Sequence, residues 1–524
     1  MGYAGQNDTG REAAGVRRRK GRGRMFSTDD LVAQAQAFAE EQWDRVQADL
    51  ADLVAIDSAK GKPDAAAGAP YGPGPRRALD AMLAKARALG LEAHECDGHI
   101  GYADLPGCGP DVGGAGAQGR RQLGIIGHLD TVPAGAGWSS DPLTLTERDG
   151  LLVGRGVSDD KGPLICAVHA VRFWTERNAR TGQAFPHDIR LLFGCDEESG
   201  MGDADWYLAH FAAPDFLFTP DAEFPVCYGE KGQFQALIES QPIAGGAIRD
   251  LSAGQAVNAV PGSARATVVA APGQLTQATG ITVAPAAGPD AAGLFTVEAA
   301  GVAGHAAMPE GSVNALGVLA SYLLAQGVGT AAEQEWLRLV RAATAATDGS
   351  LFGIACADAD FGPLTCVAGK ARTVPAGPTA SAPRFARFTL SIDCRFPTAI
   401  DCATLQQKVA AYLQQAVPGA TLTPLSQVEP LLVDPDTAPV RALRQAYRAA
   451  SGRDAAPVTM GGGTYAHHFP VGTSFGAEDL TRFPRPSWAG GMHAVDEAVP
   501  VAELKQALVA YIVAIGLLMD GDLA

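Results

Sequence analysis

Hydrophobic and polar residues alternate in a way that predicts helices interleaved with strands in the first half of the chain. Apolar residues at helical spacing, or in short uninterrupted runs, set these elements apart. The predicted helices are 27–53, with Ser27 as N-cap, 73–90 and 164–174, and the predicted strands are 123–127, 189–193 and 216–218. Strands that alternate with helices predict an α/β sheet.

The middle of the chain follows a different pattern. Strands are predicted at 234–238, 265–269, 295–299 and 385–392, and helices at 315–324 and 405–413. Segments rich in Gly, Pro and Ala separate them. We therefore predict an α+β domain inserted into the α/β domain. The α/β pattern resumes with a helix that begins after 436–439 and ends at Gly452.

Composition excludes some classes of partner. The 524 residues include 41 Lys and Arg against 57 Asp and Glu, a net charge of −16, which disfavours nucleic acid as the main partner. The apolar run 507–519 is too short for a bilayer, which needs about 20 residues. We expect a buried helix there and no membrane partner.

The chain begins with a basic segment that ends in RRRKGRGR at 17–24. No apolar segment follows, so it is not a secretory signal. A disordered tail over 1–24 is the main interpretation, with a nucleic-acid-binding arm as the alternative.

The nine cysteines are odd in number and contain no CxxC pair. This usage indicates reduced thiols in a cytoplasmic protein.

Polar residues follow the three predicted strands at their carboxyl ends. His128 and Asp130 follow the first strand, Glu197 and Glu198 the second and Asp221 the third. Ligands bind at the carboxyl ends of strands in open α/β sheets. Such a cluster of carboxylates would repel itself without a cation, and imidazole with carboxylate oxygen suits zinc or a similar divalent ion.

Longer motifs then resemble a known family. The matching segments are GHLDTVP at 127–133, GRGVSDDKG at 154–162, DEESG at 196–200, TPDAEFP at 219–225, GEKG at 229–232, NAVP at 258–261, GHAAMP at 304–309, GGGTY at 461–465 and MH at 492–493. The first three resemble the co-catalytic dizinc peptidases of the aminoacylase/carboxypeptidase G2 family. The others resemble its dipeptidase branch, called PepV or Xaa-His dipeptidase.

The resemblance implies a centre of two divalent metals, with zinc first and manganese or cobalt as alternatives. The implied metal ligands are His128, Asp159, Glu198, Asp221 and His493, with Asp159 bridging both ions. A hydroxide between the ions would attack the peptide bond. Glu197 is implied as the general base and Asp130 as the acceptor that orients the imidazole of His128. The bond between Asp159 and Asp160 is expected to be cis.

The inserted domain is implied to supply further contacts. His305 matches the donor that stabilises the oxyanion. Substrate contacts are implied for Asn258, Arg395, Gly462, Gly463 and Thr464, with Arg395 suited to a free C-terminal carboxylate. One position departs from the branch, because His467 stands where the branch usually carries Arg. Substrate preference is open for that reason.

These expectations combine into one architecture. We predict an aminopeptidase-like α/β catalytic domain with a mixed sheet at 25–232 and 431–524, interrupted by an inserted α+β lid domain at 233–430. The implied function is zinc-dependent hydrolysis of dipeptides with a free amino end, by a cytoplasmic monomer acting on a small peptide. The alternatives are an N-acyl amino acid deacylase or desuccinylase of the same fold, and a metal-binding protein without activity.

Overall fold

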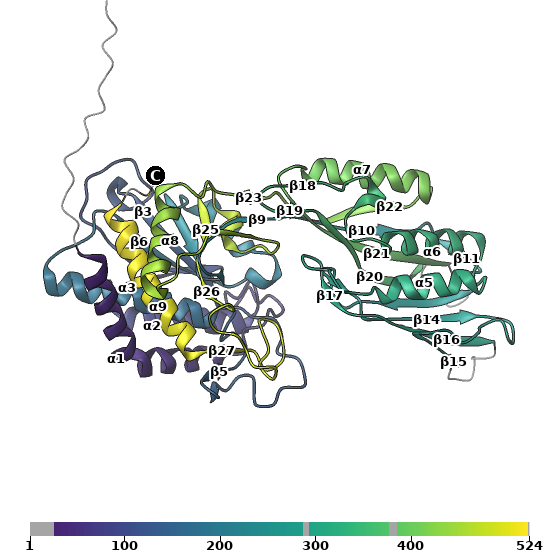
Figure 1. Ribbon diagram of the computed structural model, residues 1–524, viewed down its shortest axis with the longest axis horizontal. Coiled ribbons are helices and arrows are strands. Elements are labelled where there is room, and N and C mark those ends of the chain that lie inside the picture. The colour runs from purple at the N-terminus through teal and green to yellow at the C-terminus, as the bar shows by residue number, and fades with distance from the viewer. Residues whose placement is uncertain (1–25, 287–292, 377–384, 522, 524) are drawn as a thin grey trace, which may run out of the picture.

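The chain forms two lobes, each built on its own sheet (Figure 1). The computed structural model describes residues 26–286, 293–376, 385–521 and 523. The basic segment 1–24 therefore lies outside the described residues. Two separate apolar clusters form the cores of the lobes. The second lobe is an insertion, because the chain returns from it to the first, and we call it the lid.

The sheet of the first lobe is mixed. Its strand order is β1 (Glu92–Cys96), β2 (Ile100–Leu105), β6 (Asp188–Gly194), β3 (Gln122–His128), β7 (Phe216–Thr219), β25 (Gly472–Ser474), β9 (Cys227–Glu230) and β23 (Leu431–Leu432), with β24 (Val458–Met460) also on β9. Strands β6, β3, β7 and β25 run parallel, whereas β1, β2 and β23 pair antiparallel with their neighbours. This confirms the predicted mixed α/β sheet.

Helices cover both faces of this sheet. One apolar cluster unites the sheet with α1 (Thr28–Val54), α2 (Pro73–Ala88), α3 (Lys161–Thr181), α8 (Ala438–Ser451) and α9 (Val501–Asp520). A smaller cluster lies over β2, β6 and β7, where α4 (Gly202–His210) and the 3₁₀ turn η4 (Tyr465–His468) pack. Ser27 caps α1 as predicted, accepting a hydrogen bond from the backbone N–H of Asp30.

The C-terminal helix α9 is the most apolar helix of the first lobe. Among the described residues it is the one helix whose length and composition would allow it to cross a membrane. It packs against α1, α3 and α8, and most of its side chains are buried. It is therefore a buried helix in the core of this lobe, as predicted.

The lid sheet is antiparallel. Its strand order is β15 (Ile281–Pro285), β16 (Leu294–Ala300), β14 (Ser263–Val269), β12 (Ile248–Ala253), β20 (Thr365–Ala376), β21 (Phe385–Phe396), β10 (Gly232–Glu239) and β22 (Thr421–Val428), with β11 (Ile243–Ala244) on β21. Helices α5 (Ala315–Ala325), α6 (Ala331–Ala343) and α7 (Cys402–Ala416) share its apolar core. The inserted α+β architecture is confirmed, and α6 is an addition to the predicted helices.

Short ribbons complete the fold. They are β4 (Thr146–Arg148), β5 (Leu151–Val153) and β27 (Ala498–Pro500), β8 (Ala222–Glu223) with β26 (Ala477–Glu478), β13 (Ala259–Val260) with β17 (Gly304–His305), and β18 (Ala357–Asp358) with β19 (Gly362–Pro363). The chain passes from β9 to β10 at Lys231 and returns from β22 to β23 through 429–430. Figure 1 shows these two crossings between the lobes.

Candidate metal centre

Three neighbouring parallel strands deliver polar side chains to one edge of the first sheet. His128 is the last residue of β3, and its side chain is fully buried. Glu197 and Glu198 lie in the 3₁₀ turn that follows β6, and Asp221 lies just after β7. Because β6, β3 and β7 are adjacent, the sheet itself brings these residues together.

Two loops add the remaining ligand candidates. Asp159 lies two residues before α3, and His493 lies in the segment that precedes β27. Nε2 of His128 is 2.9 Å from Oδ1 of Asp159, and Nε2 of His493 is 2.9 Å from Oδ2 of the same carboxylate. The two oxygens of Asp159 thus face one imidazole each, the arrangement that a bridging ligand requires.

A second carboxylate accompanies each imidazole. Nε2 of His493 is 2.9 Å from Oε2 of Glu198, and Nε2 of His128 is 3.7 Å from Oδ2 of Asp221. The residues therefore form two sets of ligand candidates that share Asp159, one with His128 and Asp221 and the other with His493 and Glu198. Glu197 also comes within 4.8 Å of ligand atoms of His128 and Asp221. Distance alone therefore does not separate a base from a ligand at this position.

The electrostatics of the cluster favour a bound cation. Burial, followed by the charge of Asp221, raises the pKa of Glu197 well above its ordinary value. Burial and the charge of Asp159 raise the pKa of Asp221 to about 7. Carboxylates crowded in this way keep their charge only beside a cation. Imidazole nitrogen with carboxylate oxygen is a donor set that zinc accepts, so these residues fit the implied metals.

A buried glutamate that the sequence analysis did not identify holds the bridging residue in place. Glu497 accepts hydrogen bonds from the backbone N–H groups of Ser158 (2.9 Å) and Asp159 (3.3 Å) and pairs with Arg155 at 2.6 Å. It follows His493 by four residues, which is the one sequence signal that could have pointed to it. The peptide bond between Asp159 and Asp160 is cis, as expected.

Asp130 is close to His128 but contacts it through its backbone. Nδ1 of His128 is 2.9 Å from the carbonyl oxygen of Asp130, whereas the nearest carboxylate oxygen is 3.6 Å away, too far for a hydrogen bond. The carboxylate instead accepts the backbone N–H groups of Glu197 and Glu198, both at 3.2 Å. Asp130 therefore orders the turn that carries the two glutamates, and its carbonyl sets the imidazole tautomer.

The lid presents His305 on a two-stranded ribbon. Strand β17 carries His305 opposite Ala259 of β13, and Asn258 immediately precedes β13. The carbonyl of Asn258 accepts the N–H of Ala306 at 2.9 Å. His305 is exposed, and its Nδ1 accepts the N–H of Ala307 at 3.2 Å. A neutral imidazole that accepts at Nδ1 carries its proton on Nε2, so Nε2 is a donor. Partial desolvation of the ring by surrounding protein atoms, followed by the charge of Arg395, lowers the pKa of His305 and favours that neutral form.

Arg395 and the glycine segment 461–464 lie together where the lobes meet. Nη1 of Arg395 donates to the carbonyl oxygen of Gly461 at 3.3 Å, while its Nε lies 2.8 Å from Asp393. Its charge is thus already balanced within the lid. Thr464 is buried, and Glu230 accepts both its N–H at 2.9 Å and its hydroxyl at 2.7 Å. Gly463 is exposed and Gly462 half-buried.

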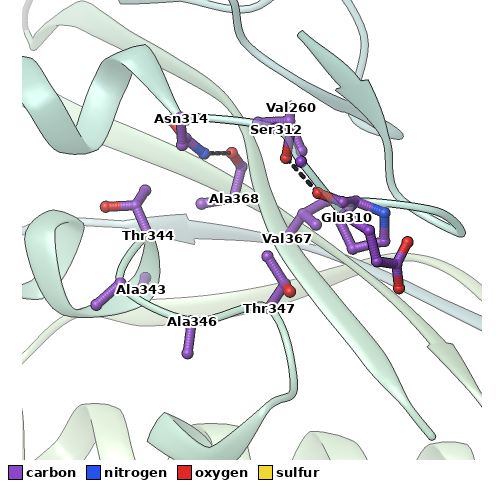
Figure 2. Close-up of a pocket in the computed structure, with 13 residues that line it drawn as sticks. Val260, Glu310, Ser312, Asn314, Ala343, Thr344, Ala346, Thr347, Val367 and Ala368 are labelled. Carbon is purple, nitrogen blue, oxygen red and sulfur yellow. Dashed lines mark hydrogen bonds between the residues drawn. The ribbon is translucent and has the colours of Figure 1, made fainter. Parts of the chain in front are cut away.

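A separate cavity lies in the lid, beside the ribbon that carries His305 (Figure 2). Its volume is about 270 Å³, and Val260 and Val367 form part of its wall. Two of the polar side chains at its wall are bonded to the protein itself, Asn314 to the carbonyl of Ala368 at 2.8 Å and Ser312 to that of Pro309 at 2.6 Å. None of the candidate metal ligands lines it.

The sequence profile of peptidase family M20/M25/M40 matches residues 124–515. The chain belongs to this family. By family it is a metallopeptidase, and its ligand candidates all lie within the matched range.

Two relatives are similar over most of their length. A Staphylococcus aureus protein provisionally named a dipeptidase is 30% identical over 509 residues, covering 90% of this chain and 96% of that protein. A Staphylococcus saprophyticus protein of the same provisional name is 29% identical over 456 residues, covering 84% and 90%.

Solved structures share the fold at low sequence identity. Human carnosine dipeptidase 1 has a TM-score of 0.55 at 15% identity and covers 93% of this chain and 99% of its own. The dipeptidase Dug1p from Saccharomyces cerevisiae has a TM-score of 0.55 at 14% identity, with coverage of 94% and 100%. At these identities the likeness shows the fold.

Proposed function

We propose that this protein is a dipeptidase of the PepV branch that requires two divalent metal ions, zinc first, and hydrolyses dipeptides with a free amino end. One observation carries the proposal, namely that the two carboxylate oxygens of Asp159 each face a different histidine at 2.9 Å. His128 and Asp221 would complete one metal site, and His493 and Glu198 the other. The provisional dipeptidase name of the staphylococcal relatives supports the substrate class.

When bound, two such ions would polarise the scissile carbonyl and lower the pKa of a water molecule toward neutrality. The residues of the chain would then transfer the proton, stabilise the oxyanion and orient the substrate. Glu197 would take a proton from the attacking water and deliver it to the nitrogen of the leaving amine. Its backbone N–H is held by Asp130, so the carboxylate is presented from an ordered turn.

The lid would complete the site from the other side. Nε2 of His305 would donate to the oxygen that becomes negative in the tetrahedral intermediate. Asn258, Arg395 and the backbone N–H groups of Gly462 and Gly463 would orient the carboxyl end of the substrate. Thr464 would keep this segment ordered and would not bind the substrate itself, because its N–H and its hydroxyl are both bonded to Glu230.

We propose that one chain is sufficient for activity. The proposal is supported by His305 and His493 belonging to the same chain and by the charge of His493 contributing to the lowered pKa of His305. Light scattering after size exclusion should therefore give the mass of a single chain.

A cytoplasmic location is proposed from the thiols, because all nine cysteines lie among the described residues and none is in a disulfide.

The test is a substrate screen on purified protein reconstituted with zinc, manganese or cobalt. Free dipeptides should be hydrolysed, and the same dipeptides with an acetylated amino end should be poor substrates. Hydrolysis of N-acyl or N-succinyl amino acids without dipeptide cleavage would instead establish a deacylase. No turnover with any metal on either class would contradict both activities.

A further inference from the structure

One histidine links the two points where the chain crosses between the lobes. Nδ1 of His467 lies 2.7 Å from Oε2 of Glu230, the last residue of β9 before the outgoing crossing. Its Nε2 lies 2.5 Å from the carbonyl oxygen of Glu429, on the returning crossing. The side chain of His467 is 5% exposed and that of Glu230 is 1% exposed, so water does not readily replace the contact between them, whereas the contact with Glu429 lies at the surface.

Glu230 also fixes the glycine segment beside the site. Its carboxylate accepts four donors, which are the N–H and hydroxyl of Thr464, the hydroxyl of Ser474 at 3.0 Å and Nδ1 of His467. An ionised carboxylate has about four acceptor positions, so all are filled. The 1% exposed carboxylate thus joins the end of segment 461–464 to the crossing.

This geometry sets the protonation state of His467. A carboxylate whose acceptor positions are all filled and a backbone carbonyl both accept hydrogen bonds and donate none. A neutral imidazole has a single N–H and would leave one of the two contacts without a donor. Both contacts are therefore made together only by the imidazolium form, with a proton on each nitrogen.

The charges around His467 come from three elements. Glu230 of β9 and the carbonyl of Glu429 favour the charged ring, and Arg395 of β21 opposes it. Burial also opposes the charge, but the bonds to Glu230 and Glu429 outweigh it and raise the pKa of His467. The carboxylate of Glu429 points elsewhere, accepting the N–H of Cys402 at 3.0 Å.

We infer that His467 and Glu230 form a positioning pair that locks segment 461–464 and both lobe crossings into one arrangement for binding the carboxyl end of the substrate. The lock holds while His467 is an imidazolium. The inference rests on the proposed dipeptidase activity for its kinetic consequence, but the lock itself is a property of the unliganded chain. His467 is a positioning residue, because it acts through Glu230 and Thr464.

The sign of the pH dependence follows from the raised pKa. A group whose pKa is higher in the folded protein contributes fully below its ordinary pKa, which is about 6.5 for histidine. The contribution is lost as the pH rises through the higher folded pKa. The lock should therefore hold in mildly acidic solution and loosen on the alkaline side.

Hydrogen exchange tests the lock without any turnover. We expect His467→Gln to lower the protection factor of the Thr464 amide roughly tenfold or more, because a buried charged hydrogen bond is lost. His468→Gln is the matched control, since His468 contacts the exposed Asp205 at the surface and neither crossing. His467→Arg, which keeps a permanent charge and donors in two directions, should restore protection. Equal protection in His467→Gln, His468→Gln and the wild type would overturn the inference.

Kinetics then test the positioning role. On a cleaved dipeptide, KM of the wild type should rise with pH above neutrality while kcat changes less, and KM of His467→Arg should stay flat over the same range. A wild-type pH profile retained in His467→Arg would overturn the pH lock. If the wild type cleaves no dipeptide, the proposed function fails, and the protection factors still decide whether the lock exists.

Discussion

Among the ligand candidates that the structure describes, Asp159 is the one that faces both histidines of the site. Each of its two carboxylate oxygens faces one histidine, whereas Asp221 and Glu198 accompany one histidine each. The hydrogen bond that the backbone N–H of Asp159 donates to Glu497 fixes Asp159 where both donor sets can use it. The loss of this one side chain should therefore affect both metal sites.

Asp159→Ala should bind neither metal tightly and lose nearly all activity. Asp221→Ala is the matched comparison, because it should weaken only the site completed by His128. Metal content after gel filtration, measured by elemental analysis, separates the two variants. Two equivalents of tightly bound zinc in Asp159→Ala would contradict the bridging role.

Glu197 and Glu198 are neighbours for which we predict different roles. Glu198 contacts His493 at 2.9 Å, and Glu197 comes within 4.8 Å of ligand atoms of His128 and Asp221, so only a measurement on variants separates their roles. Glu197→Gln should keep its metals and lose roughly 10²–10⁴-fold in kcat, the usual contribution of a positioned general base. Glu198→Gln should lose metal first. Metal loss in Glu197→Gln, with activity restored by excess zinc, would reverse the two assignments.

At the scale of elements, α9 depends on a glycine for its close packing. A Cβ on Gly516 would come within 2.7 Å of Trp174 of α3 and 2.9 Å of Leu31 of α1. The small residue lets three buried helices approach one another. This explains why a residue that disfavours helices occupies the middle of the core helix.

Gly516→Ala should therefore destabilise the first lobe. Alanine gains about 1 kcal/mol in helix propensity, but overpacking a filled core costs about 1–3 kcal/mol. We expect a net loss, seen as a lower midpoint in urea for the transition of this lobe. The double variant Trp174→Phe with Gly516→Ala should lose less than the sum of the single changes, because the nearest indole atom is gone. A higher midpoint in Gly516→Ala would show that the helices have room to separate.

Much of the element pattern was predictable because the signals are local. Uninterrupted apolar runs predicted β3, β6 and β7, and the polar residues after them predicted the site edge. Helix α6 was missed although Thr330 and Glu333 form a capping box at its start. Glu333 is buried and bonds the backbone of Ala247 and Ile248, so its role depends on a distant loop.

The parts of the site that sequence reasoning missed rest on long-range partners. Glu497 holds Asp159 across more than three hundred residues, and Glu230 meets His467 across 237. Folding brings the members of each pair together, so local patterns can draw attention to single residues but do not show that the two residues meet. Asp130 shows the same limit at short range, because the sequence predicts its proximity to His128 but not which oxygen makes the bond.

At the scale of the whole molecule, the two lobes have separate apolar cores. Two crossings of the chain connect the lobes, and Arg395 of the lid contacts Gly461 of the first lobe. The metal ligand candidates belong to the first lobe and His305 belongs to the lid. Because His305 is exposed and its Nε2 has no hydrogen-bond partner among the residues that the structure describes, it is available to a substrate held between the lobes. Activity should therefore depend on the lid even though the lid holds no metal ligand candidate.

His305→Ala tests this dependence most directly. Loss of one oxyanion donor typically lowers kcat about 10²–10³-fold, and metal content should stay at the wild-type level because the ligands lie in the other lobe. Met308→Ala is the matched control, since Met308 is 72% exposed in the same segment and carries no donor. Normal turnover in His305→Ala, with the lid folded, would mean that the oxyanion is stabilised without the lid and that the inserted domain only covers the site.

Arg395→Lys should mainly raise KM for substrates with a free carboxyl end, and it keeps a charge beside the buried Asp393. A substrate with an amidated C-terminus should discriminate little between Arg395→Lys and the wild type.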